Sequence, residues 1–328
     1  MRRDIPPLDE VRRITQKKRD AWWTVLLVDP VATPLVRLTA MRTRITPNQI
    51  TWGAFILGLG SAVLFWLGDW RWLIAGAVVY HLSFILDCMD GKVARLTGQG
   101  SVFGAWLDFV FDRIRVMACG VALMAGQYER TGDELYIWLA LAVVGLDTLR
   151  YINSLEIFKI RHSMRKQIKE RVKEARRAEN AGLGEGGRYA AELAFMEDLL
   201  RDNPDADTEQ DLQKARSAQG IAEAAPQPAP QVVDLHQEFR SRFPVYLRMR
   251  SFLLRHRIRT HLISGIEFQM GVFMIGPLID QVLWATIVSG ALLLVFELAI
   301  VYKLLLSTRD FTRTIDSFAE RGRRAAAA

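Results

Sequence analysis

Residues 87–112 read DCMDGKVARLTGQGSVFGAWLDFVFD, and this stretch decides how the rest of the chain is interpreted. Asp87 and Asp90 are three positions apart, so on a helix they share a face. Asp108 and Asp112, four positions apart, do the same. Strongly apolar runs adjoin both pairs, and carboxylates beside a membrane-length helix are costly unless they face a cavity, a cation or a partner. The stretch therefore predicts two membrane helices that bring four acids together.

Four converging carboxylates repel one another and need positive charge nearby. The nearby basic side chains that we expect to relieve this repulsion are Lys92 and Arg95. One or two bound divalent cations would neutralise the acids further, and oxygen-only ligands select hard ions such as Mg²⁺ or Mn²⁺. In a soluble protein the same pairs would be interpreted as a solvated helix face. Because membrane-length apolar runs flank them here, the functional interpretation is favoured.

The spacing of the stretch carries a family resemblance. Written out, it is Asp87-x2-Asp90-Gly91-x2-Ala94-Arg95-x8-Gly104-x3-Asp108-x3-Asp112. This resembles the signature of the CDP-alcohol phosphotransferase family, integral membrane enzymes of phospholipid synthesis, and every fixed position matches. The resemblance is strongest from residue 46 to about residue 129, and it is absent from residues 165–243.

The resemblance implies a function for each position of the signature. It implies metal-dependent displacement of CMP from a CDP-activated donor by an acceptor alcohol, with Mg²⁺ or Mn²⁺, two ions, as cofactor. The metal ligands would be Asp87, Asp90, Asp108 and Asp112, and Asp112 would also be the general base. Positions that would lie at the nucleotide are Asp87, Gly91, Ala94, Arg95 and Gly104, and more weakly Pro47, Asn48 and Thr51. A helix N-cap explains the last three nearly as well.

The donor and the acceptor stay open. CDP-diacylglycerol with a polyol acceptor is preferred because lipid could enter between helices, and a CDP-linked small alcohol with a lipid or polyol acceptor is the alternative. Arg150 and the arginines at 255, 257 and 259 would suit a phosphorylated acceptor, although solvated juxtamembrane charge explains the last three as easily. A divalent-cation transporter or sensor is the alternative from another class.

Polar residues in the later apolar segments have two interpretations. Asp147, Arg150 and Ser154 recur at helical spacing, with Asn153 and Glu156 beside them, and would either bind the acceptor or form an internal Asp147–Arg150 pair. Glu267, Gln269 and Glu297 would be interhelix hydrogen-bonding groups or, less simply, acceptor contacts.

The hydropathy pattern predicts an all-α integral membrane protein with six transmembrane helices. We expect spans near 46–67, 72–90, 102–126, 135–157, 262–279 and 282–306. The predicted regions are an N-terminal arm with an interfacial amphipathic helix around 22–28 (1–44), helices 1–4 with the signature (45–158), a charged, partly disordered cytoplasmic insertion between helices 4 and 5 (159–261), helices 5–6 (262–306) and a cytoplasmic tail (307–328). Much of 180–235 is expected to be mobile.

The distribution of charge predicts the orientation. Lys and Arg exceed Asp and Glu, which gives a formal net charge of +7. They are concentrated in the arm, the loop after Asp90, the insertion and the tail. By the positive-inside rule both termini and the acids face the cytoplasm, in the plasma membrane if the source is bacterial. The basic residues suit a lipid bilayer, and no aromatic-interleaved motif points to nucleic acid. Cys88 and Cys119 give neither a disulfide framework nor a zinc site. A homodimer is left open.

Overall fold

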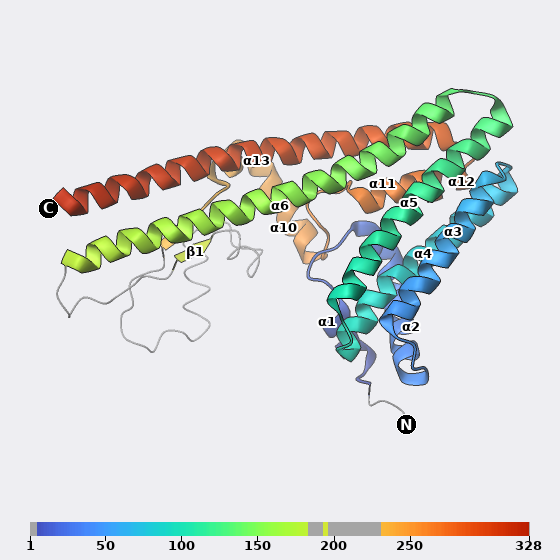
Figure 1. Cartoon of the computed structure of the whole chain (residues 1–328), viewed down its shortest axis with the longest axis horizontal. Helices are drawn as coiled ribbons and strands as arrows, with labels where there is room; N and C mark the ends of the chain where they lie inside the picture. The colour runs from blue at the N-terminus through green and yellow to red at the C-terminus, as the bar shows by residue number, and fades with distance from the viewer. Residues whose placement is uncertain (1–4, 183–192, 196–230, 328) are drawn as a thin grey trace. The chain divides into compact units, whose positions relative to one another are not determined.

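A computed structural model describes residues 5–182, 193–195 and 231–327 (Figure 1). The chain divides into two compact units. The first comprises Met1–Tyr151 with Arg257–Phe296, and the second comprises Ile152–His256 with Glu297–Ala328. Most of the segment expected to be mobile, 183–192 and 196–230, lies outside the described residues.

The first unit is built from helices. In order they are α1 (Leu8–Thr15), the π-helical turn η1 (Thr24–Val28), α2 (Asp29–Arg42), α3 (Pro47–Trp66), α4 (Trp70–Thr97), α5 (Val102–Thr131), the first part of α6 (Leu135–Gly182), α11 (Gly265–Met270), the π-helical turn η2 (Gly271–Ile275), α12 (Gly276–Leu278) and the first part of α13 (Val282–Ala327).

Local sequence signals set where the central helices begin and end. Thr46 and Gln49 form a capping box: Oγ1 of Thr46 accepts the Gln49 N–H at 3.4 Å, and Oε1 of Gln49 accepts the Thr46 N–H at 2.9 Å. Helix α4 ends at Gly98, whose φ of 67° is left-handed and favours glycine. Three residues later, the Ser101 hydroxyl accepts the N–H of Gly104 at 2.9 Å and caps α5. These signals place the chain reversal between the two acid pairs.

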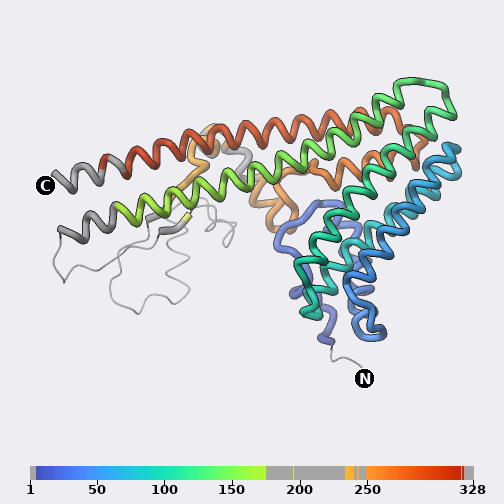
Figure 2. Tube along the Cα trace, in the orientation of Figure 1, coloured from blue at the N-terminus to red at the C-terminus, as the bar shows by residue number. Residues whose placement is uncertain are grey.

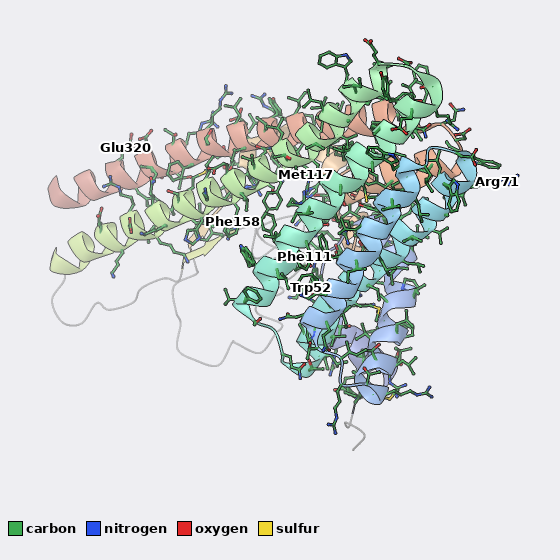
Figure 3. All side chains as sticks on the ribbon, turned by 45° about the vertical axis from the view of Figure 1, so that its right-hand side comes forward. Trp52, Arg71, Phe111, Met117, Phe158 and Glu320 are labelled. Carbon is green, nitrogen blue, oxygen red and sulfur yellow. The ribbon has the colours of Figure 1, made fainter. Side chains whose placement is uncertain are left out.

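Helix α3 packs against both α4 and α5, and α2 packs against α4 (Figure 2). Small residues allow the close approach of α3 and α4: a Cβ at Gly76 would lie 2.6 Å from the Phe65 ring, and Ser61 Oγ donates to the Gly76 carbonyl at 2.8 Å. Towards the acids, Trp52 of α3 and Phe111 of α5 meet with ring centres 4.6 Å apart (Figure 3). Packing and aromatic contacts therefore fix α3 between the acid-bearing helices.

Among the residues that the structure describes, five helices are long and apolar enough to cross a membrane. They are Thr24–Arg42, Pro47–Trp66, Trp70–Thr97, Leu135–Glu174 and Val282–Phe318. The chain is an integral membrane protein with predominantly helical structure, but the predicted count of six spans is not confirmed. Helix α5 forms where a span was expected, and four charged residues in its first half lower its hydropathy.

Two further differences from the predicted spans have local causes. The expected span at 262–279 is a shorter run of α11, η2 and α12, in which the helix type changes at Gly271 and again at Gly276. At the N-terminus the expected short interfacial helix instead continues through α2 to Arg42. Both Pro30 and Pro34 lie within this continuous run, and the π-helical turn η1 comes directly before them.

The second unit has its own small core. The later parts of α6 and α13 lie side by side there, and Asn153 Nδ2 donates to Glu297 Oε2 at 2.6 Å. Strands β1 (Leu193–Phe195) and β2 (Gln231–Val233) pair in parallel, and helices α9 (Gln237–Arg242) and α10 (Pro244–Arg255) follow. The core side chains are Ile168, Val172, Phe195, Val233, Leu235 and Phe318. The short strand pair is a minor exception to the all-α prediction.

Candidate active site

The four acids of the signature lie on two neighbouring helix ends. Asp87 and Asp90 stand in the last three turns of α4, and Asp108 and Asp112 in the first three turns of α5. One guanidinium, that of Arg115, contacts Asp87 of α4 and Asp112 of α5. The structure therefore brings the two acid pairs within electrostatic reach of each other.

Arg115 supplies the positive charge at the inner side of these acids. Its Nη2 lies 2.6 Å from Asp112 Oδ1, and its Nη1 lies 3.2 Å from Asp87 Oδ1. The side chain is buried, and it passes Gly58 so closely that a Cβ there would lie 2.5 Å from Arg115 Cδ. Its guanidinium also lies over the Tyr80 ring, 5.8 Å from the ring centre. Arg115 thus joins α3, α4 and α5 beneath the acids.

A second arginine extends the network into α6. Arg113 forms ion pairs with both Asp112 and Asp147. Asp147 is 3% exposed and also accepts from Gln269 Nε2 at 3.0 Å. Tyr80 in turn donates to Gln269 Oε1 at 3.4 Å. Because Arg113, Asp147 and Gln269 each contact another member of this network, it supports Asp112 from α6 and α11.

The prediction that Lys92 relieves the repulsion among the four acids is wrong. Lys92 forms a buried ion pair with Asp29 of α2. Two residues along a helix turn a side chain about 200°, so Lys92 faces away from Asp90. Arg95 donates through Nε to the Thr15 carbonyl at 3.0 Å. The cations that contact the acids are Arg113 and Arg115, and the i, i+3 spacing of Asp112 and Arg115 was the sequence signal for the second.

The start of α3 lies against the acids. Thr51 Oγ1 donates to Asp90 Oδ2 at 2.6 Å, and Asp90 is 6% exposed. A Cβ at Gly104 would lie 2.7 Å from Asn48 Oδ1, so the absence of a side chain lets α5 approach α3. Pro47 occupies the first position of α3. Thr51 and Asn48 of the α3 turn therefore contact the signature at Asp90 and Gly104, while Gly91 and Ala94 are signature positions within α4 itself.

Other residues considered for the acceptor have contacts of their own. Glu267 caps α11, accepting from the Ser264 N–H at 3.0 Å and from its hydroxyl at 2.6 Å. The guanidinium of Arg150 lies so near Gly265 that a Cβ there would collide with it. Arg257 and Arg259 pair with Asp29 and Asp20. Gln269 and, within the second unit, Glu297 make the interhelix hydrogen bonds that were one of the two expectations for them.

The chemistry of the four acids fits a hard divalent cation, since all their donors are carboxylate oxygens. The residues that would hold such an ion are Asp87, Asp90, Asp108 and Asp112. Within the described ranges, no three His, Cys, Asp or Glu side chains are grouped as a ready-made metal site. Three of the four acids instead contact other side chains: Asp87 and Asp112 contact Arg115, and Asp90 contacts Thr51.

Residues 44–175 match the family model described as CDP-alcohol phosphatidyltransferase. This part of the chain is therefore similar to the CDP-alcohol phosphatidyltransferases. It contains all four acids together with Arg113, Arg115 and Asp147.

Curated relatives share parts of this region. Phosphatidylinositol phosphate synthase of Corynebacterium glutamicum is 40% identical over 89 residues, which cover 27% of this chain and 37% of the relative. The Mycobacterium tuberculosis protein of the same name is 36% identical over 131 residues, covering 38% and 56%. Archaetidylinositol phosphate synthase of Pyrococcus horikoshii is 37% identical over 86 residues, covering 26% and 44%. The chain thus spans between about a third and somewhat more than half the length of these relatives.

Proposed function

We propose that the protein transfers a phospho-alcohol group from a CDP-activated donor to an acceptor alcohol and releases CMP. The observation that carries this proposal is the complete acid signature within the region similar to the CDP-alcohol phosphatidyltransferases, with its two pairs within electrostatic reach. A cation transporter would need acids arranged through the membrane. Instead, Asp147 is engaged with Arg113 and Gln269, and Glu267 caps a helix.

In the proposed reaction the acceptor hydroxyl attacks the phosphorus that carries the donor's alcohol. The bond from that phosphorus to the CMP oxygen breaks, CMP leaves with the electron pair, and the hydroxyl proton passes to a carboxylate of Asp112. Asp87, Asp90 and Asp108, with Asp112, would hold two divalent ions, Mg²⁺ or Mn²⁺, and such ions would supply neutralising positive charge for the reacting phosphates.

The chain's own residues prepare this reaction. Arg115 and Arg113 fix the orientation of Asp112, and Thr51 fixes that of Asp90. Gly91 and Ala94 leave room for the nucleotide, because a Cβ at Gly91 would meet within 4 Å only Arg95 Nη1, at 3.6 Å. By the same proposal, Gly104, Pro47 and Asn48 would also lie at the nucleotide, and Arg95 would pair with a phosphate through its Nη atoms, since its Nε donates to the Thr15 carbonyl.

CDP-diacylglycerol is the preferred donor and a phosphorylated polyol the preferred acceptor. The relatives' names, phosphatidylinositol phosphate synthase and archaetidylinositol phosphate synthase, support a lipid-linked donor. An apolar groove of about 700 Å³ between α3 and α5 also suits hydrocarbon; its lining includes Leu59, Val63, Trp66, Ile114, Met117 and Val121. Following the charge distribution, we place the site at the cytoplasmic face.

The test uses the purified full chain in lipid–detergent micelles with radiolabelled CDP-diacylglycerol and a panel of inositol phosphates and other polyols. CMP release should require Mg²⁺ or Mn²⁺ and vanish in Asp112→Ala. Glu129→Gln, an exposed acid near the end of α5, is the matched control and should release CMP like the unchanged protein. CMP release only from CDP-linked small alcohols would favour the second donor class. Metal-dependent ion flux without CMP release would overturn the proposal in favour of transport.

A further inference from the structure

Asp29 is a buried carboxylate that lies outside the family match and contacts two cations from distant parts of the chain. It pairs with Lys92 of α4, and the side chains of both residues are 5% exposed. Its other oxygen, Oδ2, lies 3.2 Å from Nη2 of Arg257. Lys92 alone would balance the charge of Asp29. The second contact, with Arg257, therefore also joins the segment around Arg257 to α2 and α4.

The segment that follows Arg257 is attached to the N-terminal arm by its backbone. The Asp20 N–H donates to the Arg257 carbonyl and the Arg259 N–H donates to the Asp20 carbonyl, both at 2.9 Å. Trp22 Nε1 donates to the carbonyl of Leu262 at 2.9 Å. These contacts hold residues 257–262, which lead into α11, against residues 17–29.

Arg257 adopts a backbone conformation that only its contacts explain. Its φ of 62° is left-handed, which is unfavourable for a residue with a long side chain. In this conformation Nη2 also donates to the Lys17 carbonyl at 3.0 Å while contacting Asp29. Because the contacts with Lys17 and Asp29 hold Arg257 in this unfavourable conformation, they fix the position of the chain before α11 relative to the N-terminal arm.

We propose that Asp29 is a positioning residue for the acids of the signature. Through Lys92 it holds the end of α4 two residues beyond Asp90. Through Arg257 it fixes the entry to α11, whose Gln269 supports the Asp147–Arg113–Asp112 network. Both acid-bearing helices therefore depend on one carboxylate whose own ion pairs are with Lys92 and Arg257. The consequence for turnover rests on the proposed function; the consequence for the order of α4 does not.

The test compares hydrogen–deuterium exchange of residues 87–97, and CMP release, in the full chain in micelles. Asp29→Asn keeps the shape of the side chain and removes its charge. Exchange in 87–97 should be at least fivefold faster, and kcat at least tenfold lower, with KM for the donor changed less than threefold. Asp29→Glu should restore part of kcat. The control Asp9→Asn, in the exposed Asp9–Arg12 pair, should match the unchanged protein in both measurements.

Two further variants keep the proposal falsifiable if Asp29→Asn does not fold. Asp29→Asn combined with Lys92→Met leaves no unpaired lysine, and Arg257→Asn keeps a residue that tolerates the left-handed conformation. Both should show the same faster exchange. Unchanged exchange in 87–97, or a kcat per folded molecule equal to that of the unchanged protein, would overturn the proposal. If the unchanged protein itself releases no CMP, the proposed function fails while the exchange comparison still decides the role of Asp29.

Discussion

Arg115 lies one helical turn beyond Asp112 on α5, and its Nη2 is 2.6 Å from Oδ1 of that carboxylate. The same guanidinium reaches Asp87 on α4. A planar, permanently charged group can hold two carboxylates in fixed directions, which a lysine cannot do. The acids are thus arranged around a cation that belongs to the protein.

Replacing Arg115 by Met should destabilise the fold. It removes a buried cation that pairs with two partly buried carboxylates and leaves Asp112 with Arg113 alone; breaking a fully buried pair costs about 3–5 kcal/mol, so the loss should approach that range. Thermal unfolding in micelles should show a clearly lower midpoint, and Arg115→Lys should recover only part of the loss. An unchanged midpoint in the Met variant would show that the ion pairs contribute nothing to stability.

Gly58→Ala tests whether the position of Arg115 matters without removing its charge. A Cβ at this position would lie 2.5 Å from Arg115 Cδ, so the guanidinium must shift, and we expect a loss of about 1–3 kcal/mol together with slower CMP release. Gly60→Ala is the matched control, since a Cβ there meets nothing within 4 Å. The control should be neutral or more stable by up to about 1 kcal/mol because alanine favours helix. Equal behaviour of the two variants would contradict the steric argument.

Thr51→Val should weaken the site at Asp90. The change keeps the volume and removes the hydroxyl that donates to the carboxylate at 2.6 Å, a hydrogen bond to a charged group worth about 1.5–3 kcal/mol. CMP release should fall about tenfold, while Thr51→Ser, which keeps the donor, should retain most of it. Similar rates for the two variants would show that this hydrogen bond does not orient Asp90.

Removal of divalent ions should abolish CMP release. EDTA treatment should reduce the rate to background, and Mg²⁺ or Mn²⁺ should restore it. In electron paramagnetic resonance titrations, Mn²⁺ should bind the unchanged protein and bind Asp90→Asn at least tenfold more weakly. Activity that persists in EDTA would remove the metal from the mechanism.

The helices that carry the acids were predictable from sequence, except that α4 continues from Asp90 to Thr97, where a loop was expected. The Thr46 capping box marks the start of α3, Gly98 and Ser101 mark the end of α4 and the start of α5, and the i, i+3 and i, i+4 acids follow from helix geometry. Apolar length alone was less informative at the N-terminus. There α2 continues past Pro30 and Pro34.

The partners of the charges were less predictable. Lys92 pairs with Asp29, which is 63 positions away, and no local pattern connects the two residues. Asp147 had a candidate partner nearby in Arg150, but its contacts include Arg113 and Gln269 from other helices. Which cation pairs with which acid depends on the direction in which each side chain leaves its helix. The linear sequence does not show how the helices then face one another.

The capping arrangement has an electrostatic consequence at the site. Helices α3 and α5 both begin beside the acids, whereas α4 ends there, as the contacts of Asn48 with Gly104 and of Thr51 with Asp90 require. The partial positive charges of two helix N-termini therefore flank the partial negative charge of one C-terminus. An anion would be attracted by the N-termini of α3 and α5, and a cation that accompanies it by the C-terminus of α4. The peptide groups would supply this attraction without any further ionised side chain.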